Sequence, residues 1–347
     1  MASKKQVKVG KLLLGGGAPV AVQSMLNTPA GDVDACVTQA KALEAAGCEI
    51  IRTTVPDMAA VKTVAALKEA VAVPIVADIH FDYRMALEAA EAGADKIRLN
   101  PGNIGADDRV KAVAEKCCEK NIPIRIGVNS GSVEKEILAK YGAPTAEALV
   151  ESALYHVSLL QKHDFDDIVI SLKSSSVKTA VEASRLMAQK ADYPLHIGIT
   201  EAGTERMGML KSAAGIGSLL LDGIGDTVRV SLTADPVKEV YAAYDILKAV
   251  GVRQKGVNLV SCPTCGRTRI DLIGLASRVE EALRGCDKNI TVAVMGCAVN
   301  GPGEASNADI GIAGGNGYGL LFAKGEILEK LPEDALFDAL MEKIKEL

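Results

Sequence analysis

The feature that most constrains the fold is a regular alternation of short β-rich runs with Ala-rich helical stretches. Helical patterns follow the β-rich runs, and several stop at a glycine, as at Gly47 and Gly93, which suits the left-handed end of a helix. Strands that alternate with helices predict a parallel sheet, because parallel strands need crossover connections. Eight runs have the composition of buried strands: Pro19–Met25, Glu49–Val55, Pro74–His80, Lys96–Pro101, Pro123–Asn129, Asp167–Lys173, Pro194–Thr200 and Asp226–Leu232.

Eight such units fit a closed (β/α)8 barrel, a TIM barrel of about 250 residues. We expect it to occupy residues 1–251. An open doubly wound α/β sheet is the alternative, since periodicity alone does not distinguish the two folds.

The composition changes after Gly251, and residues 252–256 have the character of a short linker. Residues 257–347 then predict a small α+β domain. Its expected elements are a strand at Val257–Val260, a helix at Asp271–Leu283, a strand at Ile290–Met295 and a final helix at Glu333–Leu347. The glycine clusters at 15–17 and 314–317 lack a phosphate-loop pattern and predict turns.

Composition argues against several classes of partner. The chain has 39 Lys and Arg against 44 Asp and Glu, and only 3% aromatic residues with no Trp, so we expect no nucleic-acid partner. No apolar run approaches the ~20 residues of a membrane span, so we expect no membrane partner. Eight cysteines in 347 residues do not make a disulfide scaffold, and we expect a reducing, cytoplasmic setting in which clustered cysteines serve metal binding or catalysis.

Five cations fall at or near the carboxyl ends of the predicted barrel strands, where barrel enzymes carry their chemistry. They are Arg52, Arg98, Arg125, Lys173 and Arg229. Buried cations that face one another repel, so an acidic chain is not expected to gather them without an anion. Guanidinium groups suit phosphate oxygens, which predicts a multiply charged substrate such as a diphosphate. The alternative is that each cation pairs with a barrel carboxylate such as Asp78 or Glu201.

Three other polar side chains stand at strand ends. Glu201 is the strongest carboxylate candidate because it lies among the cations, although it could instead orient a neighbouring Arg or Lys. His80 and His196 could act as acid–base groups, or they could be structural hydrogen-bonding groups.

The second domain carries a cysteine pattern typical of metal sites. Cys262 and Cys265 form a C-x2-C pair, and Cys297 follows a β-rich run. This spacing suits zinc as well as iron–sulfur. Structural zinc usually takes four Cys or His ligands, but the domain has no His, and Cys286, a possible fourth ligand, lies outside any motif. The remaining cysteines, Cys36, Cys48, Cys117 and Cys118, are expected to be small apolar fillers.

Four separated motifs resemble those of the 4-hydroxy-3-methylbut-2-en-1-yl diphosphate synthase family. They are Lys96-Ile-Arg-Leu-Asn-Pro-Gly-Asn-Ile-Gly105, His196-Ile-Gly-Ile-Thr-Glu-Ala-Gly203, Ser261-Cys-Pro-Thr-Cys-Gly-Arg267 and Met295-Gly-Cys-Ala-Val-Asn-Gly-Pro-Gly-Glu-Ala305. The resemblance covers essentially the whole chain and is to the short two-domain bacterial form, without the large insertion of plant relatives.

The resemblance implies a [4Fe–4S] cluster held by Cys262, Cys265 and Cys297, with Glu304 as an unusual fourth ligand. It implies 2-C-methyl-D-erythritol 2,4-cyclodiphosphate as substrate, opened reductively by two electrons with loss of water in the non-mevalonate isoprenoid pathway. Glu201 matches the catalytic barrel carboxylate of the family, and Glu304 is implied to serve catalysis as well as the cluster. The family's substrate-binding residues match Arg52, Arg98, Arg125, Asn129, Lys173, Arg229 and Ser231.

Two partners follow from the same resemblance: reduced ferredoxin or flavodoxin as electron donor, and a second copy of the chain in a head-to-tail homodimer. Chain direction points to the same dimer, because the last barrel helix runs away from the catalytic end and the linker is short. Two other functions stay open. Lys173 could form a Schiff base in an aldolase acting on a sugar phosphate, or the chain could be a non-catalytic electron carrier or zinc-stabilised binding protein.

Overall fold

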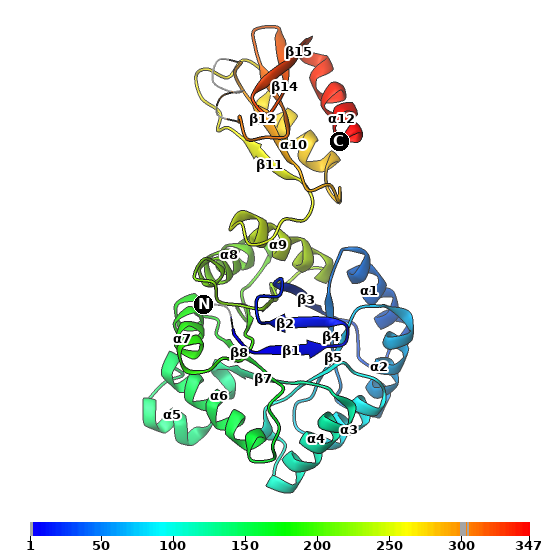
Figure 1. The fold of residues 1–347 in the computed structure, drawn as a ribbon, viewed down its shortest axis with the longest axis vertical. Helices are drawn as coiled ribbons and strands as arrows, with labels where there is room; N and C mark the ends of the chain where they lie inside the picture. Colours follow the sequence, from blue (N-terminus) through cyan, green and yellow to red (C-terminus); the bar gives the residue numbers. More distant parts are fainter. Residues whose placement is uncertain (1–2, 299–302, 304) are drawn as a thin grey trace. The chain divides into compact units, whose positions relative to one another are not determined.

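The computed structural model describes residues 3–298, 303 and 305–347. The chain forms two compact units, Met1–Arg253 and Gln254–Leu347 (Figure 1).

The first unit is built on eight parallel strands. Their order in the sheet is β8-β7-β6-β5-β4-β3-β10-β9. A parallel bridge between Ile170 and Leu195 joins β8 to β9 and closes the ring. The closed barrel is therefore confirmed, and the open doubly wound sheet is excluded. The strands are β3 (Ala21–Met25), β4 (Ile50–Thr54), β5 (Ile75–Asp78), β6 (Lys96–Arg98), β7 (Ile124–Asn129), β8 (Ile168–Lys173), β9 (His196–Ile197) and β10 (Thr227–Val228).

Helices surround the strands (Figure 1). Side chains of Asp32, Asp57 and Ser176 each accept a backbone N–H in the first turn of the helix that follows, which fixes where α1, α2 and α7 begin. Gly47 and Gly93 follow the helix ends with φ of 91° and 94°, as the sequence predicts. The helices are α1 (Val33–Ala45), α2 (Met58–Ala70), α3 (Tyr83–Glu91), α4 (Asp107–Lys120), α5 (Lys135–Tyr141), α6 (Ala146–Gln161), α7 (Val177–Lys190), α8 (Glu205–Leu221) and α9 (Pro236–Ala249).

An N-terminal hairpin, β1 (Gln6–Val9) and β2 (Leu12–Gly15), is a feature that the sequence analysis did not anticipate. Val7, Val9 and Leu14 pack against residues at the starts of the barrel strands, including Ile50. The hairpin therefore covers the amino-terminal end of the barrel, across which it lies in Figure 1. Each strand has only four residues, too few for a clear alternating pattern.

The second unit contains a five-stranded sheet in the order β11-β12-β13-β14-β15. The strands are β11 (Asn258–Ser261), β12 (Thr291–Met295), β13 (Ile310–Gly314), β14 (Tyr318–Ala323) and β15 (Glu326–Pro332). The first three are parallel and the last two pairings are antiparallel. Helices α10 (Leu272–Ala282) and α12 (Leu336–Glu346) pack on the sheet through a core that includes Leu272, Val279 and Leu340. The predicted strands at 257–260 and 290–295 correspond to β11 and β12, whereas β13 to β15 were not predicted.

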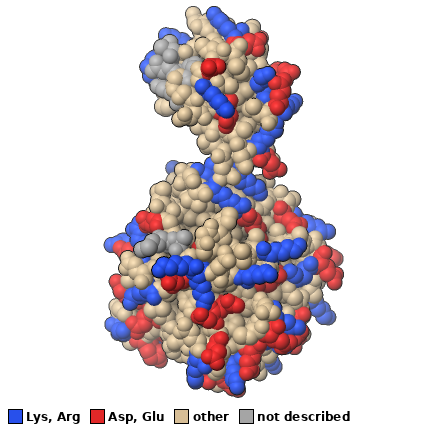
Figure 2. Space-filling view, viewed as in Figure 1, with Lys and Arg blue, Asp and Glu red and all other residues tan. Residues whose placement is uncertain are grey.

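Lys and Arg side chains are interspersed with Asp and Glu on the visible face of the barrel unit (Figure 2). Among the described residues, no helix has the length and apolar character that a membrane crossing requires.

Candidate functional site

The barrel directs a group of basic side chains to the carboxyl end of its strands. Arg52, Arg98, Arg125 and Lys173 lie on β4, β6, β7 and β8, and Arg229 directly follows β10. Arg98 and Arg125 are register partners on neighbouring strands. Arg125 and Lys173 are only 1% and 6% exposed. The structure thus brings all five predicted cations to one end of the barrel, largely out of water.

Asp78, at the end of β5, is a counterion shared by two of the arginines. Its carboxylate lies 3.0 Å from Arg98 Nη1 and 3.5 Å from Arg52 Nε. His80 Nε2 lies 3.9 Å from the same carboxylate. Burial disfavours the charged form, but the coulombic effect of Arg52 and Arg98 outweighs it and lowers the pKa of Asp78 to about 2. Asp78 is therefore ionised at neutral pH.

Glu239, which the sequence analysis did not single out, pairs with Arg229. Its two carboxylate oxygens each lie 3.2 Å from a guanidinium nitrogen. The same carboxylate accepts hydrogen bonds from Ser24 Oγ and from the backbone N–H of Leu232. Glu239 comes from α9 and is buried on the face that packs on the barrel. An acidic residue on the apolar face of a predicted helix is the signal that could have found it.

Pairing with buried carboxylates thus explains how the charges of Arg52, Arg98 and Arg229 are balanced. It does not explain Arg125 and Lys173, the two most buried of the five cations. Arg125 donates one long hydrogen bond of 3.4 Å to Gln23 Oε1, and its Nε has no partner among the described residues. Burial and neighbouring cations lower the pKa of Lys173 well below its usual value. A Cβ at Gly198 would lie 3.2 Å from Lys173 Nζ, so the glycine leaves space for this amine.

Glu201 lies in the loop after β9, exposed, with φ of 51°. A non-glycine residue in this left-handed region is uncommon and is often found at functional sites. Glu201 forms no ion pair with Arg or Lys among the described residues, so the expectation that it could serve as their counterion is wrong in this structure. Asn129 ends β7 and its backbone N–H donates to Ser132 Oγ at 2.9 Å, while Ser231 lies two residues beyond Arg229 and is half-buried.

His196 is buried inside the barrel rather than exposed at its mouth, the end at which the barrel strands have their carboxyl termini. Its Nδ1 lies 2.5 Å from Thr227 Oγ1. Burial, followed by the charges of Lys173, Arg125 and Lys96, lowers its pKa well below the usual value. His196 is therefore neutral at neutral pH.

The cysteines of the second unit are placed by two neighbouring parallel strands. Cys262 directly follows β11, and Cys297 lies two residues beyond β12, so both stand at the same end of the sheet. The backbone N–H of Gly296 donates to Cys262 Sγ at 3.2 Å. Cys265 is exposed, and hydrogen bonds from Arg267 lower the pKa of its thiol. Glu304 lies outside the described residues.

The other cysteines differ in their surroundings. Cys36, Cys48 and Cys117 are buried in the barrel core, as expected for apolar fillers, whereas Cys118 is exposed. Burial raises the pKa of Cys48 and of Cys117 to about 12, so both are inert thiols. Among the described residues, no group of three His, Cys, Asp or Glu side chains is close enough to hold a metal ion.

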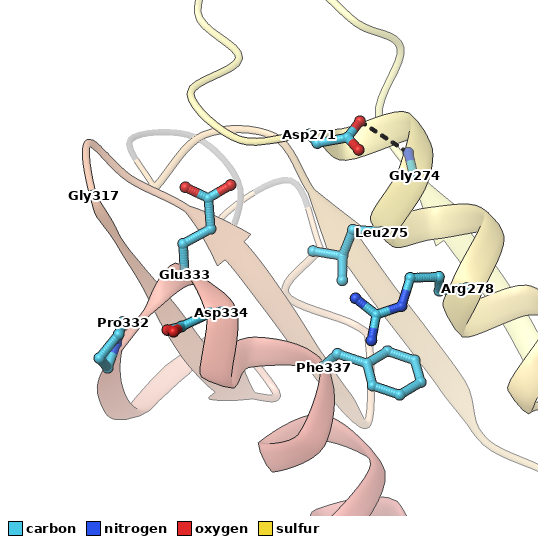
Figure 3. Close-up of a pocket in the computed structure, with 9 residues that line it drawn as sticks. All are labelled: Asp271, Gly274, Leu275, Arg278, Gly317, Pro332, Glu333, Asp334 and Phe337. Atoms are coloured by element: carbon cyan, nitrogen blue, oxygen red, sulfur yellow. Dashed lines mark hydrogen bonds between the residues drawn. The ribbon is translucent and has the colours of Figure 1, made fainter.

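A cavity of about 510 Å³ in the second unit is separate from the cysteines (Figure 3). The Arg278 guanidinium stacks over Phe337, 4.2 Å from its ring centre. Asp271 accepts the backbone N–H of Gly274 at the start of α10. None of Cys262, Cys265 and Cys297 lines this cavity.

Comparison with known proteins agrees with this architecture. Residues 4–244 match the family model described as the GcpE TIM-barrel domain, and residues 258–346 match the GcpE protein C-terminal domain. Among solved structures, dihydropteroate synthase of Yersinia pestis has a TM-score of 0.52 at 16% identity, covering 72% of this chain and 100% of that chain. A truncated 3-deoxy-D-arabino-heptulosonate 7-phosphate synthase of Thermotoga maritima also gives 0.52 at 13% identity, covering 73% and 97%. Both are similar in the barrel fold.

Curated relatives are similar over the full length. The 4-hydroxy-3-methylbut-2-en-1-yl diphosphate synthase (flavodoxin) of Geobacter sulfurreducens is 58% identical, covering 100% of this chain and 98% of the relative. The protein of the same name from Clostridium perfringens is 57% identical, covering 98% of each. With both domains and full-length relatives in agreement, this chain belongs to the GcpE family of 4-hydroxy-3-methylbut-2-en-1-yl diphosphate synthases.

Proposed function

We propose that this chain catalyses the reductive ring opening and dehydration of 2-C-methyl-D-erythritol 2,4-cyclodiphosphate to 4-hydroxy-3-methylbut-2-en-1-yl diphosphate. Its full-length relatives are named 4-hydroxy-3-methylbut-2-en-1-yl diphosphate synthase (flavodoxin), and the reaction would make it an oxidoreductase of the non-mevalonate isoprenoid pathway. The single observation in the structure that carries the proposal is the group of buried cations at the barrel mouth, of which Arg125 and Lys173 have no carboxylate bound to them among the described residues. Neither an aldolase nor a non-catalytic carrier is among these named relatives.

The diphosphate would be bound by Arg52, Arg98, Arg125, Asn129, Lys173, Arg229 and Ser231. Asp78 and Glu239 hold three of the arginine side chains in place before substrate arrives. This arrangement reduces the ordering cost of binding. Lys173 and Arg125 would gain their first full counterions from the phosphate oxygens. Glu201 would handle protons near the reacting carbon, since it is an exposed carboxylate after β9 that forms no ion pair with Arg or Lys in the described part of the chain.

The second unit suits a [4Fe–4S] cluster held by Cys262, Cys265 and Cys297, with Glu304 as the fourth ligand. The fit rests on the donor set: thiolates are the usual ligands of such clusters, and two come from the ends of adjacent strands. The Gly296 N–H that donates to Cys262 Sγ is a contact of the kind that tunes a cluster's potential. When bound, the cluster would deliver the two electrons of the reaction. Glu304 would hold the iron that substrate approaches.

The name of the relatives includes flavodoxin, which supports reduced flavodoxin as electron donor over ferredoxin. An oxygen-sensitive cluster and a reduced protein donor both favour the reducing cytoplasm.

A head-to-tail homodimer is the assembly that we propose. Arg253, the last residue of the barrel unit, donates to Glu49 at 2.7 Å and to Val20 O at 3.0 Å, at the amino-terminal end of the strands. Helix α9 has 14 residues and so carries the chain back by about 21 Å, from the carboxyl end of the strands towards the end where Arg253 lies. Residues 254–257 span at most about 14 Å before β11 begins. The cluster domain of a second copy of the chain can reach the cation-lined end of the barrel without the limit that this short linker sets.

Substrate affinity tests the placement of the mouth. Arg98→Ala and Arg229→Ala should each weaken binding of the cyclic diphosphate by about 1.5–3 kcal/mol, or roughly 10- to 150-fold in Kd, because a charge-assisted phosphate contact is lost. The matched control is Arg185→Ala on α7, where the side chain is 47% exposed and pairs with Asp222. Calorimetric titration measures all three variants. Unchanged affinity in Arg98→Ala and Arg229→Ala would mean that substrate binds elsewhere.

A further inference from the structure

Beneath the mouth, inside the barrel, lies a layer of buried polar side chains, of which only Arg125 belongs to the proposed substrate-binding set. Four side-chain atoms there have no hydrogen-bond partner among the described residues: Gln23 Nε2, Lys96 Nζ, Arg125 Nε and His196 Nε2. Each of these side chains is at most 1% exposed. They come from β3, β6, β7 and β9, and the first and third touch through Gln23 Oε1. Four strands of the barrel therefore each contribute a buried polar atom without a hydrogen-bond partner in the described part of the chain.

The charges around Lys96 are unbalanced. Arg125 and Arg52 act on Lys96 directly, and Arg98, Lys173 and Arg229 stand at or after the ends of neighbouring strands. In the described part of the chain, the buried carboxylates that pair with these cations are Asp78 and Glu239. Below Lys96 the hairpin contributes only apolar side chains, such as Val9, and Asp226 is bound to Ser3 and to the Leu195 N–H. Two carboxylates against six nominal cations, Lys96 included, leave an excess of buried positive charge.

Without a bound anion, the excess is relieved by groups that can lose a proton. Guanidinium groups keep their proton in proteins, whereas a lysine amine can release it when buried. Burial is the largest effect on Lys96, followed by repulsion from Arg125 and Arg52, and together they hold its pKa well below the usual value. The pKa of His196 and that of Lys173 are lowered as well, by burial first and by neighbouring cations second. Below the proposed substrate cations the barrel thus buries an amine, Lys96 Nζ, that has no hydrogen-bond partner among the described residues and whose surroundings favour the neutral form.

We propose that Lys96 takes up one proton from solvent when the diphosphate binds to the cations above it, and so acts as a charge-compensating positioning residue of the substrate site. The amine becomes an ammonium, and no bond to the substrate forms. The two negative charges of the substrate offset part of the excess positive charge and so favour the charged form of Lys96. This inference rests on the proposed function, because the anion is the proposed substrate.

Calorimetry measures the uptake directly. The full-length protein is titrated with 2-C-methyl-D-erythritol 2,4-cyclodiphosphate in several buffers that differ in ionisation enthalpy. Each phosphorus of this ligand carries one strongly acidic oxygen, so the ligand itself takes up no proton near neutral pH. The dependence of the observed enthalpy on the buffer then gives the number of protons taken up. We expect a net uptake in the wild type, and about one proton less in Lys96→Met. The exposed Lys62→Met is the matched control and should behave as the wild type.

The outcomes separate the inference from the proposed function. Failure of the cyclic diphosphate to bind to the wild type would contradict the proposed function. Binding without proton uptake, or equal uptake in wild type and Lys96→Met, would overturn the role of Lys96 alone. If Lys96 had a purely structural role, its substitution would change the affinity for the cyclic diphosphate but not the number of protons taken up on binding. Should Lys96→Met not fold, Lys96→Gln replaces it. A His196→Gln variant that alone lost the proton would assign the uptake to His196 and overturn the inference.

Discussion

A single carboxylate, Asp78, lies between two arginines, Arg52 and Arg98, of the proposed substrate site. Its position explains how the barrel tolerates these cations without ligand, because removal of one partner from a buried ion pair leaves an uncompensated charge. The sequence predicted that the five cations lie on or directly after barrel strands, and the structure has them there; their role in binding substrate stays a prediction. It could not decide which cations are paired, because pairing depends on side-chain reach across strands and from α9. Glu239 was missed for this reason.

Asp78→Asn should therefore destabilise the barrel by about 3–5 kcal/mol at neutral pH. The carboxyl has a lowered pKa in the folded state, so its stabilising effect is present above about pH 4 and is lost as the pH falls through about 2. The difference between wild type and variant should accordingly shrink in acid. Urea denaturation at several pH values measures this.

The control for this variant is Asp82→Asn. The Asp82 carboxylate pairs with Arg84, whose side chain is 70% exposed, and caps α3, a role that Asn fills equally well. Its effect should be within about 0.5 kcal/mol. Equal losses in the two variants would contradict the role assigned to Asp78.

At the level of elements, the sequence predicted those strands whose apolar pattern was clear. All eight barrel strands lie within the predicted runs, because buried parallel strands give continuous apolar segments. Strands β13 and β14 were missed because glycine obscures their pattern. A Cβ at Gly319 would lie 2.3 Å from Leu336 Cδ1, and one at Gly311 would lie 2.5 Å from Phe322 Cζ. These glycines permit close packing within the second unit, a need that sequence composition does not reveal.

The strand ends that carry Cys262 and Cys297 give a prediction at the same scale. Cys297→Ser should abolish both cluster loading and turnover, because it removes a thiolate that the proposed cluster requires. Cys286→Ser is the matched control: it removes a half-buried thiol of the same unit outside the motifs and should keep both. Iron and sulfide content, visible absorption and turnover of anaerobically purified protein measure the effect. A Cys297→Ser protein with full iron content would refute this ligand set.

For the whole molecule, the question is whether one catalytic site is shared between two chains. Chain direction gives the argument, since the barrel unit ends at the amino-terminal side of its strands, where Arg253 binds Glu49. The sequence predicted this direction from the order of strand and helix alone, but it could not show that Arg253 anchors the exit.

Complementation between two inactive variants tests the shared site. Cys297→Ser inactivates the cluster domain and Glu201→Gln inactivates the barrel site. In a mixed dimer, the intact barrel of the Cys297→Ser chain would meet the intact cluster domain of the Glu201→Gln chain. One of the two catalytic sites would then work, and the other would carry both substitutions. Random exchange of equal amounts gives half mixed dimers, so recovery should approach about a quarter of wild-type activity. Subunit exchange is verified independently with two distinguishable affinity tags. Exchange without recovery, or full activity in a monomeric wild type, would show that each chain completes its own site.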